Sequence, residues 1–377
     1  MTSANTILFV TRSLGHGGAE RQLMTLARGL HARGVTVHVA QFYEQGDFGR
    51  ELRDAGVPLI SLGKGGRWDV LSFLRRLRRL IVTLRPSVVH SYLVEPNWMT
   101  TLLKPTLRGP AFVWGVRASD MEFERYGRVA QASFALSRGL SRFADLIIAN
   151  SRAGAHFHTS HGYPEDRMLV IPNGIDTAYF HPRPESRSAV RQALGLPDGT
   201  PLVGVVGRLD PMKDHQTFLA AASSVHGARP DVHFICVGRG DAATTSRLQD
   251  TARSLGLGQH VHWQDQWSDL PSLYSGLDLL VSSSAFGEGF PNVVAEAMAC
   301  GTACVVTDVG DSADVVGDTG LVVPRRDPGA LAQGIAALMA RLPASAQARD
   351  RIVSNFGIDA LVERTMNALA PFGGARA

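Results

Sequence analysis

Short apolar runs and helix-patterned segments alternate along this chain, and this alternation constrains its fold more than any other feature. Residues 7–10 form the first apolar run, a glycine-rich stretch follows, and apolar residues then recur at helical spacing until Gly34. Val35, Val37 and Val39 next alternate with polar residues, as in a β-strand. This order predicts a βαβ unit, in which the two strands are parallel.

The unit recurs in two series. In the first series, strands are expected near residues 58–62, 87–90, 111–115 and 146–149, with helices at 70–84, 122–140 and 153–161. In the second series, strands are expected near 202–206, 233–237, 261–263, 279–282, 303–306 and 321–323, before a final helix at 357–370. The two series predict an α/β fold with two parallel sheets, each covered by helices on both faces. Ligands of such sheets bind where the strands end.

A polar, proline-rich stretch at 181–201 separates the two series, and a chain of 377 residues exceeds what one hydrophobic core usually organises. We therefore expect two domains, residues 1–178 and residues 179–356. The C-terminal segment 357–377 is expected to pack back on the first domain.

Composition narrows the class of protein. Hydrophobic residues make up 45% of the chain and charged residues 19%, as in a folded globular protein. Cys236, Cys300 and Cys304 form no CxxC pair, and we interpret them as small buried residues in a reducing compartment, with no metal assigned. No apolar run is long enough to span a membrane, and residues 1–10 lack the features of a signal sequence. A soluble, cytoplasmic protein is expected.

Positive charge is concentrated in the first half. Residues 1–180 carry 22 Lys/Arg against 14 Asp/Glu, and the remainder carries 16 against 20. This asymmetry suits an anionic partner such as a phospholipid surface or a lipid pyrophosphate. Nucleic acid is not indicated, because the basic residues lack interleaved aromatic residues.

The segment 70–80 is the most basic part of that half. Its apolar residues Leu71, Phe73, Leu74, Leu77 and Leu80 alternate with four arginines. They either pack on the first sheet and leave the arginines exposed, which we favour, or insert into a membrane interface. Both arrangements allow peripheral contact with the inner face of the plasma membrane.

The most informative stretch is SSSAFGEGFPNVVAEAMACG at 282–301. A strand ends near its start, Pro291 stands where a helix should begin, and Gly301 ends that helix. Glu288 then lies in the loop and Glu296 inside the helix. Loop amides at a helix start can bind a diphosphate, and a carboxylate can accept paired hydrogen bonds from sugar or ribose hydroxyls. The alternative is a surface carboxylate in a loop and a solvated one on a helix, and the pair by itself favours neither.

A second loop, within VVGRLDPMKD at 205–214, also follows a strand and precedes a helix. It presents Arg208 and Lys213, two cations that can neutralise the charge of a leaving nucleoside diphosphate. The chain has no Asp-x-Asp pair to hold a metal ion for that task. The alternative is a basic loop whose cations pair with Asp210 and Asp214.

Taken together, these motifs resemble family four of the retaining, Leloir-type glycosyltransferases. The resemblance is carried by Glu288-x7-Glu296 in EGFPNVVAEAMACG, by GRLDPMKDH upstream and by GGAER near the N-terminus, in this order along nearly the whole chain. It implies the GT-B architecture of two facing Rossmann-like domains with a cleft between them. The N-terminal domain would bind the acceptor and the C-terminal domain the nucleotide sugar. It also implies an enzyme with no cofactor and no metal requirement, whose co-substrate is a nucleotide-diphosphate sugar.

The resemblance implies roles for single residues. Arg208 and Lys213 hold the donor diphosphate, Glu296 binds the ribose hydroxyls, and Glu288 contacts the donor sugar. The other donor-binding residues implied are Gly17, Gly18, Gly238, Trp263, Gly289, Phe290, Pro291 and Asn292.

The N-terminal domain departs from the family pattern at one position. Many members carry a histidine after the strand expected at 111–115, whereas this chain has Arg117, which is predicted to take a polar role there. Arg117 completes the predicted catalytic set with Glu288, Arg208 and Lys213. His90 and Asn173 are candidates on the acceptor side. A buried structural histidine and a simple Asn-Gly turn are the alternatives for these two.

The function implied is retaining transfer of a sugar to a saccharide or a polyprenyl-pyrophosphate-linked acceptor, in bacterial lipopolysaccharide, exopolysaccharide or glycolipid synthesis. A front-face reaction is expected, in which the departing phosphate oxygen accepts the acceptor's proton. One rival is a sugar-nucleotide 2-epimerase on a similar frame. Another is an NAD-dependent dehydrogenase, because residues 238–243 have the outline GxGxxA, although not in the first βαβ unit of their domain. A non-catalytic sugar-nucleotide binding protein is the third.

Overall fold

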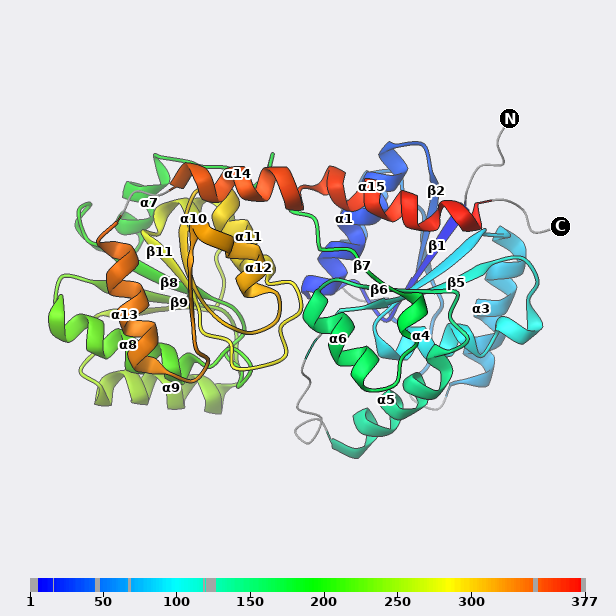
Figure 1. Cartoon of the computed structure of the whole chain (residues 1–377), viewed down its shortest axis with the longest axis horizontal. Coiled ribbons are helices and arrows are strands. Elements are labelled where there is room, and N and C mark those ends of the chain that lie inside the picture. The colour runs from blue at the N-terminus through cyan, green and yellow to red at the C-terminus, as the bar shows by residue number, and fades with distance from the viewer. Residues whose placement is uncertain are drawn as a thin grey trace. The chain divides into compact units, whose positions relative to one another are not determined.

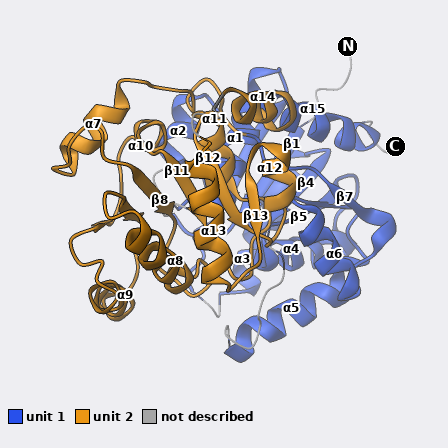
Figure 2. Ribbon diagram, turned by 60° about the vertical axis from the view of Figure 1, so that its left-hand side comes forward, with its two compact units in different colours: residues 1–174, 358–377 blue, residues 175–357 orange. Residues whose placement is uncertain are grey.

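The computed structural model describes residues 6–373 except 16, 45–47, 67–68, 118, 120–126 and 342–344. The chain forms two compact units (Figures 1 and 2). Unit 1 comprises residues 1–174 and 358–377, and unit 2 comprises residues 175–357. These limits lie within a few residues of the expected domain limits, 178 and 356. Within unit 2, Ile175 and Gly357 form a parallel β-bridge, so the two places where the chain enters and leaves this unit are adjacent.

Unit 1 is built on a seven-stranded parallel sheet in the order β3-β2-β1-β4-β5-β6-β7. Its strands are β1 (Thr6–Thr11), β2 (Thr36–Gln41), β3 (Leu59–Ser61), β4 (Val88–Tyr92), β5 (Ala111–Val116), β6 (Leu146–Ala149) and β7 (Met168–Val170). Its helices are α1 (Gly18–Ala32), α2 (Phe48–Asp54), α3 (Leu71–Leu84), α4 (Val94–Thr101), α5 (Gly127–Ser141), α6 (Arg152–Ser160) and α15 (Ile358–Leu369). The strand order reverses between β1 and β4, which pair directly.

Unit 2 has a six-stranded parallel sheet in the order β10-β9-β8-β11-β12-β13. Its strands are β8 (Leu202–Val206), β9 (His233–Val237), β10 (Val261–Gln264), β11 (Leu279–Ser282), β12 (Ala303–Thr307) and β13 (Leu321–Val323). Its helices are α7 (Ser186–Ala193), α8 (His215–Ala228), α9 (Ala242–Ser254), α10 (Leu270–Gly276), α11 (Asn292–Ala299), α12 (Ser312–Val316), α13 (Pro328–Met339) and α14 (Ser345–Phe356). Here the order reverses between β8 and β11.

The two parallel sheets confirm the predicted α/β class, and each is covered on both faces. In unit 2, residues of α8, α9 and α13 form one buried cluster with the sheet, and residues of α10, α11 and α14 form another on the opposite face. In unit 1, α1 and α15 cover one face and α3 and α4 the other. Every strand named from the apolar runs is present, and Cys236, Cys300 and Cys304 are buried as expected. Strand β7 carried too short a pattern to be predicted.

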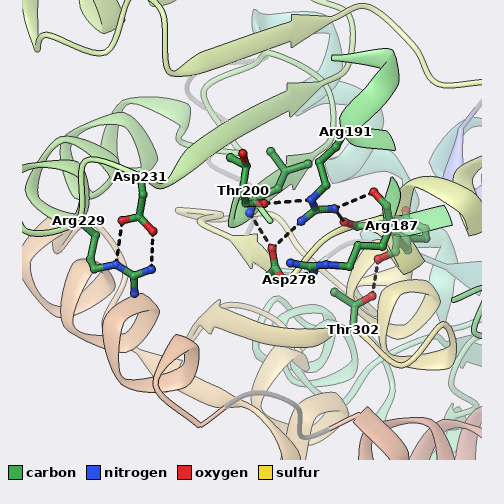
Figure 3. Close-up of polar contacts among 10 residues, drawn as sticks. Arg187, Arg191, Thr200, Arg229, Asp231, Asp278 and Thr302 are labelled. Carbon is green, nitrogen blue, oxygen red and sulfur yellow. Dashed lines mark hydrogen bonds and ion pairs between the residues drawn. The ribbon is translucent and has the colours of Figure 1, made fainter. Parts of the chain in front are cut away.

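The polar stretch at 181–201, which was expected to separate the two series, lies within unit 2, and this corrects that expectation. It contains α7, whose Arg191 is fully buried and donates to the carbonyl oxygen of Thr200 (3.0 Å) and to Asp278 Oδ2 (2.7 Å). Asp278 also accepts from the backbone N–H of Leu202 (2.7 Å), so the helix is tied to the start of β8 (Figure 3). Its charged side chains gave the stretch its polar composition, although one of them lies in the interior.

Helix α3 packs its apolar residues on the sheet of unit 1, as the favoured alternative predicted. Phe73 and Leu77 are buried in the cluster between helix and sheet, and Leu74 and Leu80 are partly buried against it. Leu71 is the exception, with 71% of its surface exposed. Insertion of the whole apolar set into a membrane is therefore wrong. In the described part of the chain, no helix is both long and apolar enough to cross a bilayer.

Candidate functional site

In unit 2, Lys213 and Glu288 meet where the strand order of the sheet reverses. Lys213 follows β8, Glu288 follows β11, and the Nζ of Lys213 forms an ion pair and a hydrogen bond with Glu288 Oε1. Ser284 Oγ donates to the same oxygen (2.6 Å). The carboxyl ends of strands at such a reversal are where open α/β sheets bind ligands. The pairing brings together the two loops that the sequence singled out separately.

Glu288 is a buried carboxylate, with 7% of its surface exposed. Burial raises the pKa of its carboxyl group, but the charge of Lys213 and the hydrogen bonds from Lys213 and Ser284 outweigh burial and hold that pKa below its ordinary value. The group is therefore ionised at neutral pH. The alternative of a surface carboxylate in a loop is wrong.

The loop after β8 is held by its own acidic residues. Asp210 Oδ1 accepts from the backbone N–H groups of Met212 (3.1 Å) and Lys213 (3.3 Å). Asp214 has φ +44° and caps α8 by accepting from the N–H of Thr217 (3.2 Å). Both aspartates thus shape the backbone that presents Lys213.

Arg208 differs from Lys213 in its surroundings. Its side chain is 73% exposed, and its Nη2 lies 2.8 Å from Asp210 Oδ2. The alternative of a basic loop paired with Asp210 and Asp214 holds for Arg208 and not for Lys213. A cation paired only at the surface can turn to a ligand at small cost, because such pairs contribute about 0–1 kcal/mol.

Helix α11 has the predicted limits. It begins after Pro291, and Gly301, with φ +83°, ends it by donating its N–H to the carbonyl of Met298 (2.9 Å). Glu296 is 2% exposed, and its Oε2 accepts a hydrogen bond from Tyr274 (3.0 Å). The alternative of a solvated helix carboxylate is therefore wrong. Tyr274 lies on α10, where no sequence signal distinguished it from a core residue.

The segment 287–291, with Gly289 and Phe290, is held by a third loop. Gly310, after β12, has φ +63°, and a Cβ there would lie 2.6 Å from the carbonyl oxygens of Glu288 and Gly289. Asp311 donates its N–H to the carbonyl of Gly289 (3.0 Å). The glycine at 310 thus lets two loops touch through their backbones. The position of Gly310 after a predicted strand could have been noted in the sequence, but nothing in the sequence indicated which loop it would contact.

The glycines of the GxGxxA outline serve a similar contact. A Cβ on Gly238 would lie 1.9 Å from the carbonyl oxygen of Gly207, and one on Gly240 would lie 2.7 Å from Cβ of Leu209. The loop after β9 therefore packs on the loop after β8, and Asp241 caps α9. Contact between two loops explains both glycines without a dinucleotide.

Trp263 lies on the edge strand β10 and is partly buried against the core cluster that includes residues of α8 and α9. Trp267, just beyond the strand, packs against the cluster on the opposite face. Of these two tryptophans, only Trp263 is among the predicted donor-binding residues. Asn292 opens α11 and is partly exposed.

In unit 1, Arg117 follows β5. Its guanidinium lies over the ring of Tyr92 (4.3 Å to the centroid), and its Nη1 is 3.4 Å from Asn173 Oδ1. No carboxylate of the described residues forms an ion pair with Arg117. Burial lowers the pKa of the guanidinium only from a very high value, so it stays charged. The structure thus brings two predicted residues, Arg117 and Asn173, together.

His90, the other acceptor-side candidate, has no exposed surface. It lies in β4 with no exposed area, between the rings of Phe9 (5.2 Å) and Tyr92 (4.9 Å). Burial lowers its pKa far below the ordinary value, so the ring is neutral. An acceptor has no surface of His90 to contact, and the buried alternative holds.

Gly17 and Gly18 open helix α1. Gly17 is the N-cap, with φ −78° and extended backbone, and Gly18 is the first helical residue. Neither residue has a positive φ, so no left-handed turn requires a glycine at these two positions. No group of three or more His, Cys, Asp or Glu side chains within the described ranges is arranged to hold a metal ion.

Two family models match the chain in succession. Residues 16–179 match the model described as Glycosyltransferase Family 4, and residues 200–341 match the one described as Glycosyl transferases group 1. Among curated relatives, a lipopolysaccharide core biosynthesis mannosyltransferase of Rhizobium meliloti is 32% identical over 59% of this chain and 64% of its own length. A D-inositol 3-phosphate glycosyltransferase of Segniliparus rotundus is 33% identical over 52% of this chain and 45% of its own. The matches thus cover about half to just under two thirds of these relatives.

Solved structures extend the likeness over nearly the whole chain. Anabaena HepE in complex with UDP-glucose superposes with a TM-score of 0.86 at 22% identity, covering 97% of this chain and 99% of that one. WaaG, a glycosyltransferase involved in lipopolysaccharide biosynthesis, gives 0.73 at 17% identity over 96% and 99%. At these identities the likeness concerns the fold, which is GT-B. With both family models matched in order on that fold, the chain belongs to the family-four glycosyltransferases.

Proposed function

We propose that this protein is a metal-independent, retaining glycosyltransferase that takes a sugar from a nucleoside-diphosphate sugar bound to unit 2. The observation that carries the proposal is the pair of Lys213 and Glu288, buried where the strand order reverses, with the exposed cation of Arg208 on the same loop. Family membership supports the reaction class. The Lys213–Glu288 pair supports the location of the donor site in unit 2.

The donor diphosphate would take Lys213 and Arg208 as its counter-charges. Each cation is now held by one carboxylate, Lys213 by Glu288 and Arg208 by Asp210. A diphosphate offers a higher negative charge than either carboxylate, and two fixed cations stabilise the charge that develops as it leaves. Gly289, Phe290 and the start of α11 lie beside Glu288 in sequence and would supply backbone N–H groups.

The two glutamates would have different tasks. Glu296, bonded to Tyr274 inside α11, would accept hydrogen bonds from the ribose hydroxyls. Glu288 would contact the donor sugar. Its Oε1 already accepts from Lys213 and Ser284, which suits a carboxylate that orients a hydroxyl better than one that attacks an anomeric carbon. We therefore keep the front-face reaction, in which the leaving phosphate oxygen takes the acceptor's proton.

Unit 1 would bind the acceptor and contribute Arg117 to the reacting groups. The acceptor proposed is a saccharide, free or linked to a polyprenyl pyrophosphate, in the synthesis of a bacterial cell-surface polysaccharide or glycolipid. The printed function of the Rhizobium relative, in lipopolysaccharide core synthesis, supports this class. A cytoplasmic location with peripheral contact to an anionic membrane accompanies the proposal.

A donor screen tests the proposal directly. UDP-, GDP-, ADP- and dTDP-sugars would be added singly to the full chain, and thermal unfolding would be followed, because a bound donor raises the midpoint. We expect one nucleotide class to stabilise the protein and to be turned over, with activity unchanged by a chelator. Loss of activity with EDTA and recovery with a divalent ion would contradict the assignment of the two cations.

The same screen separates the rivals. Incubating the enzyme with donor alone would yield an epimerised sugar if it were a 2-epimerase, and a shift with NAD would indicate a dehydrogenase. Glu296→Gln and Arg208→Gln should each weaken donor binding about tenfold, since each removes one charge-assisted interaction. Arg253→Gln, which removes an exposed cation paired with Asp250 on α9, is the matched control.

A further inference from the structure

The sheet of unit 1 has its own reversal of strand order, between β1 and β4, and a second cluster of charges lies there. Arg12 follows β1, and Glu95 is in the first turn of α4, directly after β4. Lys64 follows β3. In unit 2 the equivalent place holds the candidate donor site. The function proposed above assigns no role to these three residues.

Glu95 lies between two cations, with which it forms long ion pairs but no hydrogen bond. Its Oε2 is 3.8 Å from Arg12 Nε, and its Oε1 is 3.8 Å from Lys64 Nζ. Both distances exceed a hydrogen bond. Among the described residues none donates a hydrogen bond to the Glu95 carboxylate, whose side chain is 30% exposed. Its lone pairs are therefore available to a ligand.

The surrounding loops hold these charges in place. Lys64 has a side chain only 2% exposed, and its Nζ donates to Tyr43 Oη (3.1 Å) and to the carbonyl of Gly66 (2.7 Å). Tyr43 donates its N–H to the carbonyl of Arg12 (3.0 Å), and its ring lies beside both cations, 5.8 Å from the guanidinium of Arg12 and 5.5 Å from Lys64 Nζ. The accessible groups are therefore Glu95 and Arg12, at the edge of a partly exposed aromatic ring.

The backbone that presents Glu95 is strained. Leu93, the N-cap of α4, has φ +74° and ψ 169°, a region that is nearly exclusive to glycine. Its N–H is bonded to the carbonyl of Gly115 (3.1 Å), which holds this conformation. Residues kept in such conformations cluster at binding sites.

We propose that Glu95 and Arg12 form a hydroxyl-binding site for the neutral ring of the acceptor, a saccharide or a cyclitol. A hydroxyl group both donates and accepts, so an oxygen between the two side chains can donate to Glu95 and accept from Arg12. A phosphate at the same place would meet the repulsion of the Glu95 carboxylate. The inference rests on the proposed function, because it takes unit 1 as the acceptor-binding part.

Ligand-observed saturation-transfer NMR tests the site on the full chain. The probes are methyl α-D-glucopyranoside, methyl α-D-mannopyranoside, myo-inositol and inorganic phosphate, each with UDP present. We expect at least one neutral ring to bind, and Glu95→Gln and Arg12→Gln to raise its dissociation constant about tenfold, because each removes a charge-assisted hydrogen bond. The matched control is Glu51→Gln, since Glu51 of unit 1 also has an oxygen 3.7 Å from an arginine, Arg28, and is half exposed.

Three results would overturn the inference. They are equal binding by Glu95→Gln and Glu51→Gln, no transfer from any neutral ring to the unsubstituted protein, and phosphate binding to the unsubstituted protein that Arg12→Gln abolishes. Affinity for UDP is measured on the same samples. If the unsubstituted protein bound none of UDP, GDP, ADP and dTDP, the donor site in unit 2 would be contradicted, whereas the rings report on unit 1 alone. If Glu95→Gln does not fold, the binding measured for Arg12→Gln decides the test. The Arg12 side chain is 63% exposed, so its substitution should leave the fold intact.

Discussion

The side chains of Lys213 and Arg208 leave the same loop but differ in what their loss would do. Lys213 is the partner of a buried carboxylate, whereas Arg208 is paired at the surface. Lys213→Met should therefore destabilise the protein by about 3 kcal/mol, since it leaves Glu288 buried and uncompensated. Arg208→Gln should cost less than about 1 kcal/mol. Urea unfolding measures the stability of both variants, and calorimetry with the stabilising nucleotide measures donor affinity.

Both variants should nevertheless bind donor more weakly. If Lys213→Met were as stable as the unsubstituted protein, the pair with Glu288 would not be the buried interaction described here. Lys213→Met with Glu288→Gln completes a double-mutant cycle, and the coupling energy should be favourable.

Gly238 is the residue where the backbone contact is closest. In Gly238→Ala the added Cβ would lie 1.9 Å from the carbonyl oxygen of Gly207, so the loops after β8 and β9 must move apart. We expect a loss of about 2 kcal/mol or more, as for other forced overpacking, together with weaker donor binding. Gly227→Ala on α8 is the control, because a Cβ there meets nothing within 4 Å and should stabilise the helix by about 0.5–1 kcal/mol. Thermal and urea unfolding measure the stability of Gly238→Ala and of Gly227→Ala.

At the scale of elements, α7 is tied to Asp278 by two ion pairs, one from Arg187 and one from the buried Arg191. Arg191 is fully buried, and Asp278 is its only carboxylate among the ion pairs of the described residues. Arg191→Leu should cost about 3 kcal/mol or more, because it removes the buried partner of Asp278 and leaves the more exposed Arg187 as the remaining cation paired with Asp278 among the described residues. Arg229→Leu, which breaks an exposed pair with Asp231 (Figure 3), should change the free energy of unfolding by less than about 1 kcal/mol. Equal effects of the two substitutions in urea unfolding would contradict this account.

The β9–β10 edge of the same sheet has a cluster of four histidines on α8, β9 and the region of β10. His233 Nδ1 and His262 Nε2 are 3.1 Å apart, and the rings of His226 and His260 are 4.0 Å apart. The pKa of His233 is lowered to about 4, mainly by burial and to a lesser extent by the neighbouring histidines. The pKa values of His260 and His262 are also lowered.

This cluster should make the protein sensitive to mild acid. Between pH 6.5 and about 4 the unfolded chain binds protons that the folded cluster does not, so the free energy of unfolding falls as pH falls. Above pH 6.5 this contribution is complete. Urea unfolding at a series of pH values should give a smaller slope for His233→Gln than for the unsubstituted protein, while His156→Gln, at an exposed position, should leave the slope unchanged. If the free energy of unfolding of His233→Gln depended on pH as in the unsubstituted protein, the acid sensitivity would come from other groups.

At the scale of the whole molecule, the two units differ in net charge. Unit 1 contains 24 Lys/Arg against 15 Asp/Glu, and unit 2 contains 14 against 19. On α3, Arg75 and Arg79 are exposed and have no partner among the described residues, whereas Arg76 is bonded to Asp69. Attraction to an anionic surface would therefore come from charge, with little apolar insertion.

Sedimentation with lipid vesicles tests this attraction. The protein should pellet with vesicles containing phosphatidylglycerol at low salt, stay in solution with neutral vesicles, and be released at high salt, because exposed charges are screened. Arg75→Gln with Arg79→Gln should reduce binding several-fold, and Arg247→Gln with Arg253→Gln in unit 2 should not. Salt-independent binding would mean that apolar contacts dominate.

The sequence by itself determined the class of fold, every strand except β7, and the two loops of the candidate donor site. Strands buried in parallel sheets are short continuous apolar runs, and the loops between them are marked by glycine and proline, so both can be read locally. The limits of α11 followed from Pro291 and Gly301 for the same reason. Only the tertiary structure decided which charges meet: that Lys213 pairs with Glu288 and not with Asp210 or Asp214, that Arg191 is interior, and that His90 is enclosed. Pairing and burial depend on which strands become neighbours, and residues distant in sequence carry no local mark of that.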